Sequence, residues 1–160
     1  MGVCEAPFGH VEFWGTGSSL SGLQLHSTLL ECSAYLSPGD SELRQIVLAT
    51  VDYLTDPSSP LPLPPTQIGT PFQKAVWSAI RDIPLGQTRS YAEIAGQLSS
   101  HPRAVARACG LNPFPLLTPC HRVVASRGLG GFMQSGLPEA LSIKSWLLAH
   151  EVRGFTPAGA

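Results

Sequence analysis

Two stretches near the N-terminus alternate between apolar and polar residues, which is the pattern of half-buried strands. Val11 and Phe13 alternate with His10, Glu12 and Trp14, and Leu23 and Leu25 alternate in the same way after a loop rich in glycine and serine. Further along the chain, apolar residues recur at the spacing of one helix face: Leu43, Ile46, Val47, Val51 and Leu54. This pattern predicts a small sheet with one helix packed against it.

The helical pattern ends in a segment with five prolines between residues 56 and 66. Proline removes a backbone donor and disfavours helix in the residue before it, so this segment is a semi-rigid connection. We therefore divide the chain into an N-terminal support domain over 1–56, a linker over 57–69, a second domain over 70–153 and a tail over 154–160.

The second domain begins with helical patterns. Thr70, a proline at the first helical position and Gln73 form a capping box, and Ser90 and Glu93 form another. A third helix is expected from Arg103 to about Gly110, after a tight break at Ser99-Ser100-His101-Pro102. Two short helices joined by such a turn resemble a helix-turn-helix, whose second helix faces nucleic acid, but an ordinary helical hairpin fits the pattern equally well.

Composition and charge refine this description. The 160 residues are 43% hydrophobic and 13% charged, which is enough to bury a core. Because no apolar run approaches about 18 residues and the start lacks a signal sequence, we expect no membrane partner and a cytoplasmic location. The net charge is −1, but residues 1–69 carry −6 and residues 70–151 carry +4. This division predicts an acidic support and a basic working surface.

The four cysteines form no Cys-x-x-Cys pair, so free thiols are expected rather than disulfides. Four N-terminal residues have side chains suited to zinc, namely Cys4, His10, His26 and Cys32. Their spacing is irregular, and we predict that the protein requires no metal and no cofactor.

A cysteine followed by two basic residues is the most informative motif. Proline-punctuated apolar residues lead into Cys120, and His121 and Arg122 follow directly. A thiol in apolar surroundings is normally inert, whereas a neighbouring base or cation stabilises the reactive thiolate. Adjacency alone is weak support for a Cys–His pair, because neighbouring side chains in a strand point to opposite faces.

This motif resembles that of the O6-alkylguanine-DNA alkyltransferases, the methylated-DNA–protein-cysteine methyltransferases. The similarity runs from Thr70 to Glu151, about half the chain, through several motifs in the family's order: Thr70-Pro71-Phe72-Gln73, Ser90-Tyr91, Arg103-Ala104-Val105, Asn112-Pro113, Pro119-Cys120-His121-Arg122-Val123-Val124, Gly130-Gly131-Phe132 and Lys144-Ser145-Trp146-Leu147-Leu148-Ala149-His150-Glu151. The resemblance implies an α+β fold. It would combine a ribonuclease-H-like N-terminal three-stranded antiparallel sheet and helix with a C-terminal helical domain that contains a winged helix-turn-helix.

The implied function is DNA repair by direct reversal. The resemblance implies that Cys120 takes the alkyl group from a flipped O6-alkylguanine, and also from O4-alkylthymine, in a single irreversible turnover. His121 would take the thiol proton through a water molecule, Glu151 would orient His121, and Tyr91 would stabilise the leaving guanine. The implied substrate-binding residues are Asn112, Val123, Phe132, Met133, Gln134 and Ser135.

The resemblance also implies a DNA-binding surface on the third helix. Arg103 would fill the gap left by the flipped nucleotide, with Ala104, Arg107 and Tyr91 also near the DNA. The partner would be double-stranded DNA bound through its minor groove by a monomer, in the bacterial nucleoid or in a eukaryotic nucleus. Met133 and Gln134 replace the smaller residues usual in the family, which leaves the preferred alkyl group open.

Three alternatives follow from the same residues. A non-catalytic damage sensor of the alkyltransferase-like type would flip the base without chemistry, but such proteins replace the reactive cysteine, and Cys120 is present. A helix-turn-helix regulator would bind specific duplex sequences. A Cys–His hydrolase would turn over a small ester repeatedly.

Overall fold

Three antiparallel strands form the N-terminal sheet in the order β1 (Gly2–Ala6), β2 (Gly9–Thr16), β3 (Ser19–His26). The computed structural model describes residues 1–16, 19–28 and 41–154. On β2, Val11 and Phe13 are fully buried and pair with Leu25 and Leu23 of β3, as the alternation predicts. The pattern did not reveal β1, because four of its five residues are buried and alternation is absent.

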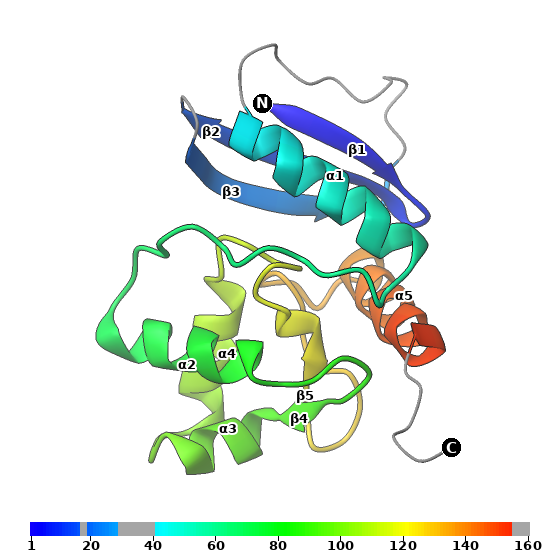
Figure 1. Ribbon diagram of the computed structural model, residues 1–160. Helices are drawn as coiled ribbons and strands as arrows, with labels where there is room; N and C mark the ends of the chain where they lie inside the picture. Colours follow the sequence, from blue (N-terminus) through cyan, green and yellow to red (C-terminus); the bar gives the residue numbers. More distant parts are fainter. Residues whose placement is uncertain (17–18, 29–40, 155–160) are drawn as a thin grey trace.

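Helix α1 (Ser41–Thr55) packs across one face of this sheet (Figure 1). Four of the five predicted apolar positions are buried, but Val51 is 40% exposed. Thr50 and Tyr53 face the core instead, and the hydroxyl of Thr50 donates to the carbonyl of Ile46 at 2.8 Å. Prediction from apolar residues alone therefore misplaced Val51, because a threonine with an internal acceptor and a tyrosine occupy the inward positions.

The proline-rich segment leaves α1 and runs between the sheet and the C-terminal helices before it reaches α2 (Figure 1). It crosses much of the molecule without helix or strand of its own. This path places it against both halves of the chain. The division into domains at this segment stays a prediction.

Three helices follow: α2 (Pro71–Arg81), α3 (Tyr91–Gln97) and α4 (Pro102–Gly110). Both predicted capping boxes are present, at Thr70 and at Ser90. Trp77 is almost fully buried on α2, and its indole nitrogen donates to the carbonyl of Ala108 on α4 at 2.9 Å. Val76 and Ile80 on α2 are fully buried, whereas Ala75 is exposed and Phe72 is only half-buried.

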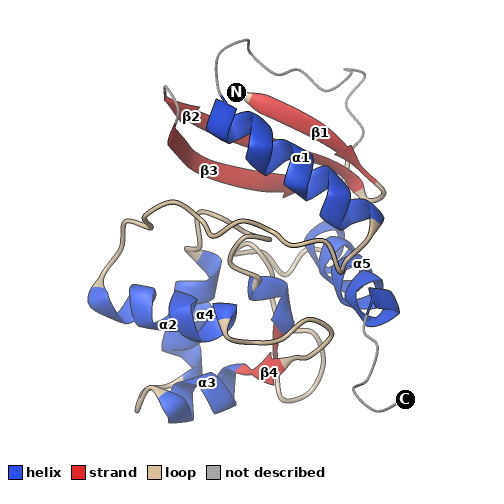
Figure 2. Ribbon diagram, in the orientation of Figure 1, coloured by secondary structure: helices blue, strands red, loops and turns tan. Residues whose placement is uncertain are grey.

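The remaining elements bring distant segments together (Figure 2). Strand β4 (Arg89–Ser90) pairs in parallel with β5 (Val123–Val124). Strand β5 directly follows a 3-10 turn, η1 (Cys120–Arg122). Helix α5 (Pro138–Gly154) closes the described chain. Two-residue strands are too short to produce a sequence pattern. The fold is α+β, as expected, while its ribonuclease-H-like and winged helix-turn-helix details stay predictions.

Within the three described ranges, no helix is both long and apolar enough to cross a membrane.

Candidate active site

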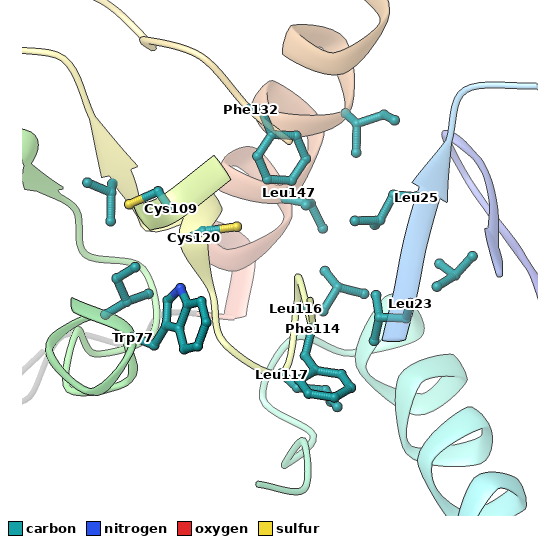
Figure 3. Packing of buried hydrophobic residues seen from close by; sticks show 14 of the residues in the cluster. Leu23, Leu25, Trp77, Cys109, Phe114, Leu116, Leu117, Cys120, Phe132 and Leu147 are labelled. Carbon is teal, nitrogen blue, oxygen red and sulfur yellow. The ribbon is translucent and has the colours of Figure 1, made fainter. Parts of the chain in front are cut away.

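Cys120 begins the turn η1, directly after Pro119, and lies in the apolar cluster that also contains Trp77, Phe132 and Leu147 (Figure 3). Its side chain is 5% exposed but lines a cleft of about 400 Å³. Burial raises the pKa of the thiol, while a hydrogen bond from Asn112 and the charge of Lys144 act in the opposite direction. The predicted nucleophile is therefore sheltered but can be reached from the cleft.

His121 follows Cys120 in the same turn and is fully buried. Because the two residues occupy a 3-10 turn rather than a strand, strand geometry does not force them apart. The Nε2 atom of His121 is 2.7 Å from Oε1 of Glu151 on α5. The predicted contact between His121 and Glu151 is thus present in the structure.

The protonation state of His121 follows from its burial and from its contact with Glu151. Burial, the largest effect, lowers the pKa of His121 and outweighs the attraction of Glu151, so the ring is neutral near pH 7. A carboxylate only accepts hydrogen bonds, so the ring proton sits on Nε2 and Nδ1 keeps its lone pair. Among the described residues, Nδ1 has no hydrogen-bond partner although it is buried. A buried imidazole with a free lone pair can accept a proton.

Glu151 is fully buried and receives hydrogen bonds from three side chains. Arg122 binds it with two nitrogens, each at 2.9 Å, and the hydroxyl of Tyr53 on α1 donates to Oε1 at 2.6 Å. Burial acts to raise the pKa of Glu151, but His121 and Arg122 together lower it well below its usual range. The carboxylate is therefore ionised although it has no contact with solvent.

One wall of the cleft is a tight turn between Phe132 and Ser135. Their backbones exchange two hydrogen bonds, at 2.8 and 2.9 Å, around Met133 and Gln134. Both central residues have positive φ angles, 49° and 60°, a conformation that costs non-glycine residues roughly 1–3 kcal/mol each. Gln134 rests on Gly110 of α4, where a Cβ atom would lie 2.7 Å from its Cγ atom. The turn therefore closes one side of the cleft against α4.

Tyr91, at the start of α3, also lines the cleft. Its hydroxyl donates to the carbonyl of Gly131 at 3.3 Å, and burial raises its pKa to about 12. Gly130 has a φ of 71° and approaches the Tyr91 ring so closely that a Cβ atom would lie 2.8 Å from it. The phenol is therefore protonated at neutral pH and can donate a hydrogen bond.

Lys144 on α5 holds this wall in place. It is fully buried, and its Nζ donates to the carbonyls of Val123, Leu129 and Gly131 at 2.6, 2.7 and 2.9 Å. The carbonyl of Val123, one of the predicted substrate-binding residues, thus already accepts one hydrogen bond, and the Val123 side chain is buried away from the cleft. Burial lowers the pKa of Lys144 to about 8.

Three of the four predicted DNA-binding residues lie on α4, and the fourth, Tyr91, begins α3. On α4, Arg103 and Arg107 are exposed, Ala104 is half-buried, and of these three only Arg107 lines the cleft. Asn112, just after α4, borders a second cleft of about 280 Å³ that also reaches Cys120. The structure therefore places the predicted substrate residues 132–135 in the cleft that Cys120 lines, and Asn112 in a second one. Arg107, but not Arg103, lines the first cleft.

The candidate zinc ligands are arranged differently. His10 stacks on His26 with ring centroids 4.4 Å apart, and Nδ1 of His10 lies 2.6 Å from the carbonyl of Thr28. Cys32 lies outside the described residues. Over the described ranges, no three residues of the Cys, His, Asp or Glu types gather in a way that could hold a metal ion.

A family model described as the DNA-binding domain of 6-O-methylguanine DNA methyltransferase matches residues 71–153. The chain belongs to this family. The matched range contains Cys120, His121 and Glu151, and it also contains both arginines of α4.

Relatives and solved structures agree with this assignment. A probable methylated-DNA–protein-cysteine methyltransferase of Acanthamoeba polyphaga mimivirus is 47% identical over 85 residues, which are 52% of this chain and 54% of the relative. A Salmonella typhimurium methylated-DNA–protein-cysteine methyltransferase is 44% identical over 85 residues, 52% of this chain and 47% of the relative. The match thus spans about half the length of these curated relatives.

Similarity in structure extends further along the chain. The Mycobacterium tuberculosis O6-methylguanine methyltransferase is 30% identical, with a TM-score of 0.76 over 97% of this chain and 93% of that one. A structure titled Mycobacterium tuberculosis OGT in complex with DNA has a TM-score of 0.67 at 30% identity, over 95% of this chain and 92% of that one. The N-terminal sheet and helix are therefore part of the shared fold.

Sequence reasoning did not predict the contacts that Arg122, Lys144 and Tyr53 make at the candidate site. Arg122 and Lys144 stand inside the motifs that carry the resemblance, so their position in those motifs was the available signal. Tyr53 gave none, because its contact with Glu151 joins residues 98 positions apart.

Tyr53→Phe tests the buried carboxylate. The change removes one donor to an ionised group, and we expect it to lower the free energy of unfolding by about 1.5–3 kcal/mol, measured by urea denaturation. Tyr91→Phe is the matched control, because its hydroxyl makes only a longer contact with one carbonyl. Equal losses in both variants would contradict the role assigned to Tyr53.

Proposed function

We propose that this protein repairs DNA by transferring the alkyl group of O6-alkylguanine, and of O4-alkylthymine, to Cys120 in one irreversible turnover. The observation that carries the proposal is a buried imidazole next to a cysteine that lines a cleft. The Nε2 atom of His121 contacts Glu151, and its Nδ1 atom is unpartnered among the described residues. A base, its orienting carboxylate and a thiol together form an activated nucleophile.

The chemistry follows from these groups. The Cys120 thiol passes its proton to Nδ1 of His121 through one water molecule, and Glu151 stabilises the imidazolium. The thiolate attacks the alkyl carbon, so a carbon–sulfur bond forms as the bond to O6 breaks. The hydroxyl of Tyr91 turns from the carbonyl of Gly131 and donates its hydrogen bond to the guanine as negative charge develops on it. The thioether is stable, and each molecule therefore reacts once.

Substrate entry requires the base to leave the helix, because an alkylated O6 inside a duplex lies out of reach of a buried thiol. The cleft of about 400 Å³ has the dimensions of a small-molecule site and opens beside α4. We place α4 in the minor groove, with Arg103 filling the gap left by the base and Ala104 and Arg107 beside it. The protein would act as a monomer in the nucleoid, or in the nucleus of a eukaryote.

The direct test is the intact mass after incubation with a duplex that carries one O6-methylguanine. We expect a single increase of about 14 Da, one methyl replacing one hydrogen, that maps to Cys120. Cys120→Ala is the matched variant and should bind the duplex without any mass change. Tight binding by the unmodified chain without a mass change would favour a damage sensor, and neither binding nor a mass change would refute the proposal.

A second prediction separates base flipping from chemistry. Arg103→Ala should slow transfer from duplex DNA by on the order of tenfold to a hundredfold, because extruding a base costs a few kcal/mol that the arginine offsets. Its reaction with free O6-benzylguanine should stay near the rate of the unmodified protein. Arg44→Ala on α1 removes the same charge far from the cleft and controls for net charge. Equal losses with both substrates would contradict a flipping role.

A further inference from the structure

A series of side-chain hydrogen bonds connects the proline-rich segment to the loop that carries Cys120. Arg81 on α2 donates through Nη1 to Oε1 of Gln67 at 2.7 Å. Gln67, which is 8% exposed, donates through Nε2 to Oδ1 of Asn112 at 3.1 Å. Asn112 donates through Nδ2 to the carbonyl of Thr118 at 2.8 Å. Three segments far apart in sequence are joined in this way.

The direction of these bonds is set at Arg81. A guanidinium has no acceptor, so the amide oxygen of Gln67 must face it and the amide nitrogen must face Asn112. Asn112 must then present its own oxygen to Gln67 and its nitrogen to the other side. The backbone N–H of Phe114 donates to the same Asn112 oxygen at 3.0 Å, which agrees with this orientation.

The nitrogen of the Asn112 amide points toward the nucleophile's surroundings. The carbonyl of Thr118 that it binds also accepts the backbone N–H of Cys120, at 2.7 Å. Asn112 and Cys120 border the same cleft of about 280 Å³. A hydrogen bond from the Asn112 side chain also acts to lower the pKa of Cys120.

We propose that Gln67 is a positioning residue for the Cys120 thiolate. Held by Arg81, it fixes the amide of Asn112 so that an N–H, and not the oxygen, faces the sulfur. The role of Gln67 in catalysis rests on the function proposed above, but its effect on the Cys120 thiol can be measured without DNA. An acceptor at position 67 would oppose this orientation, because it would face the oxygen that Asn112 also presents to the N–H of Phe114.

A substitution at Gln67 leaves the other charged or titratable groups around the Cys120 sulfur unchanged. They come from α3, α4, η1 and α5 and comprise Tyr91, Arg107, Cys109, His121 and Lys144. None of them contacts Gln67 in the described structure through a hydrogen bond. A change at Gln67 therefore reaches the sulfur through Asn112.

The experiment measures the rate at which iodoacetamide labels Cys120 as a function of pH, with the site identified by peptide mass. In this reaction the thiolate forms the new carbon–sulfur bond and iodide leaves, so the rate reports the thiolate fraction. The variants are Gln67→Ala, which removes the contact, and Gln67→Glu, which keeps the Arg81 contact but offers only acceptors. Thr66→Glu, at the exposed neighbouring position, controls for the added charge.

We expect Gln67→Ala to label about threefold to tenfold more slowly near pH 7, because the Asn112 amide loses a partner and its N–H holds the thiolate less firmly. Weaker hydrogen bonding to the thiolate raises the pKa of Cys120, so the rate should approach that of the unmodified protein at high pH. Gln67→Glu should be slower than Gln67→Ala, and Thr66→Glu should match the unmodified protein. If thermal unfolding shows Gln67→Ala to be misfolded, Gln67→Met replaces it.

Two results would overturn the proposal. If Gln67 only tethered the linker, Gln67→Glu, which keeps the Arg81 contact, would label faster than Gln67→Ala. An equal loss of labelling rate at every pH would likewise overturn it, because access to the cleft would then have changed and not the pKa of Cys120. Because iodoacetamide needs no DNA, these results are independent of whether the protein accepts alkyl groups from guanine.

Discussion

The carboxylate of Glu151 is the interaction on which the site depends. It is fully buried, and it binds His121 and Arg122 of the cysteine turn together with Tyr53 of the N-terminal helix. A buried ion costs several kcal/mol in desolvation, which only well-formed hydrogen bonds and a counter-charge can offset. Losing Arg122 would leave the charge uncompensated, and losing Tyr53 or His121 would remove a donor from it, so the carboxylate holds three segments in one arrangement.

This arrangement explains why an N-terminal half without reactive groups in the cleft still matters to the site. Tyr53 reaches Glu151 from α1, and its carbonyl lies 2.7 Å from Nε2 of His150 on α5. The backbone N–H of Leu23 on β3 donates to the carbonyl of Pro113, within the segment that leads to Cys120. The sheet and its helix therefore support the segment that carries Cys120 and leave its cleft open.

The parts of the fold that could be predicted were those with a local signal. Capping residues and apolar spacing located the strands β2 and β3 and the helices α1 to α4, and the motif around Cys120 indicated a nucleophile with its base. Tyr53 and Gln67 could not be predicted, because their roles arise only from contacts with residues 98 and 45 positions away. Val51 was misplaced because apolar character was counted while the hydrogen-bonding capacity of Thr50 was not.

The state of the His121 ring tests most directly whether Glu151 prepares a base for the cysteine. Nitrogen-15 NMR of the histidine rings, assigned with His121→Gln, would report the proton on each nitrogen between about pH 6 and 8. We expect His121 to stay neutral throughout, with its proton on Nε2 and a free lone pair on Nδ1. A doubly protonated ring near pH 7, or a proton on Nδ1, would show that His121 cannot accept the thiol proton in the way the structure requires.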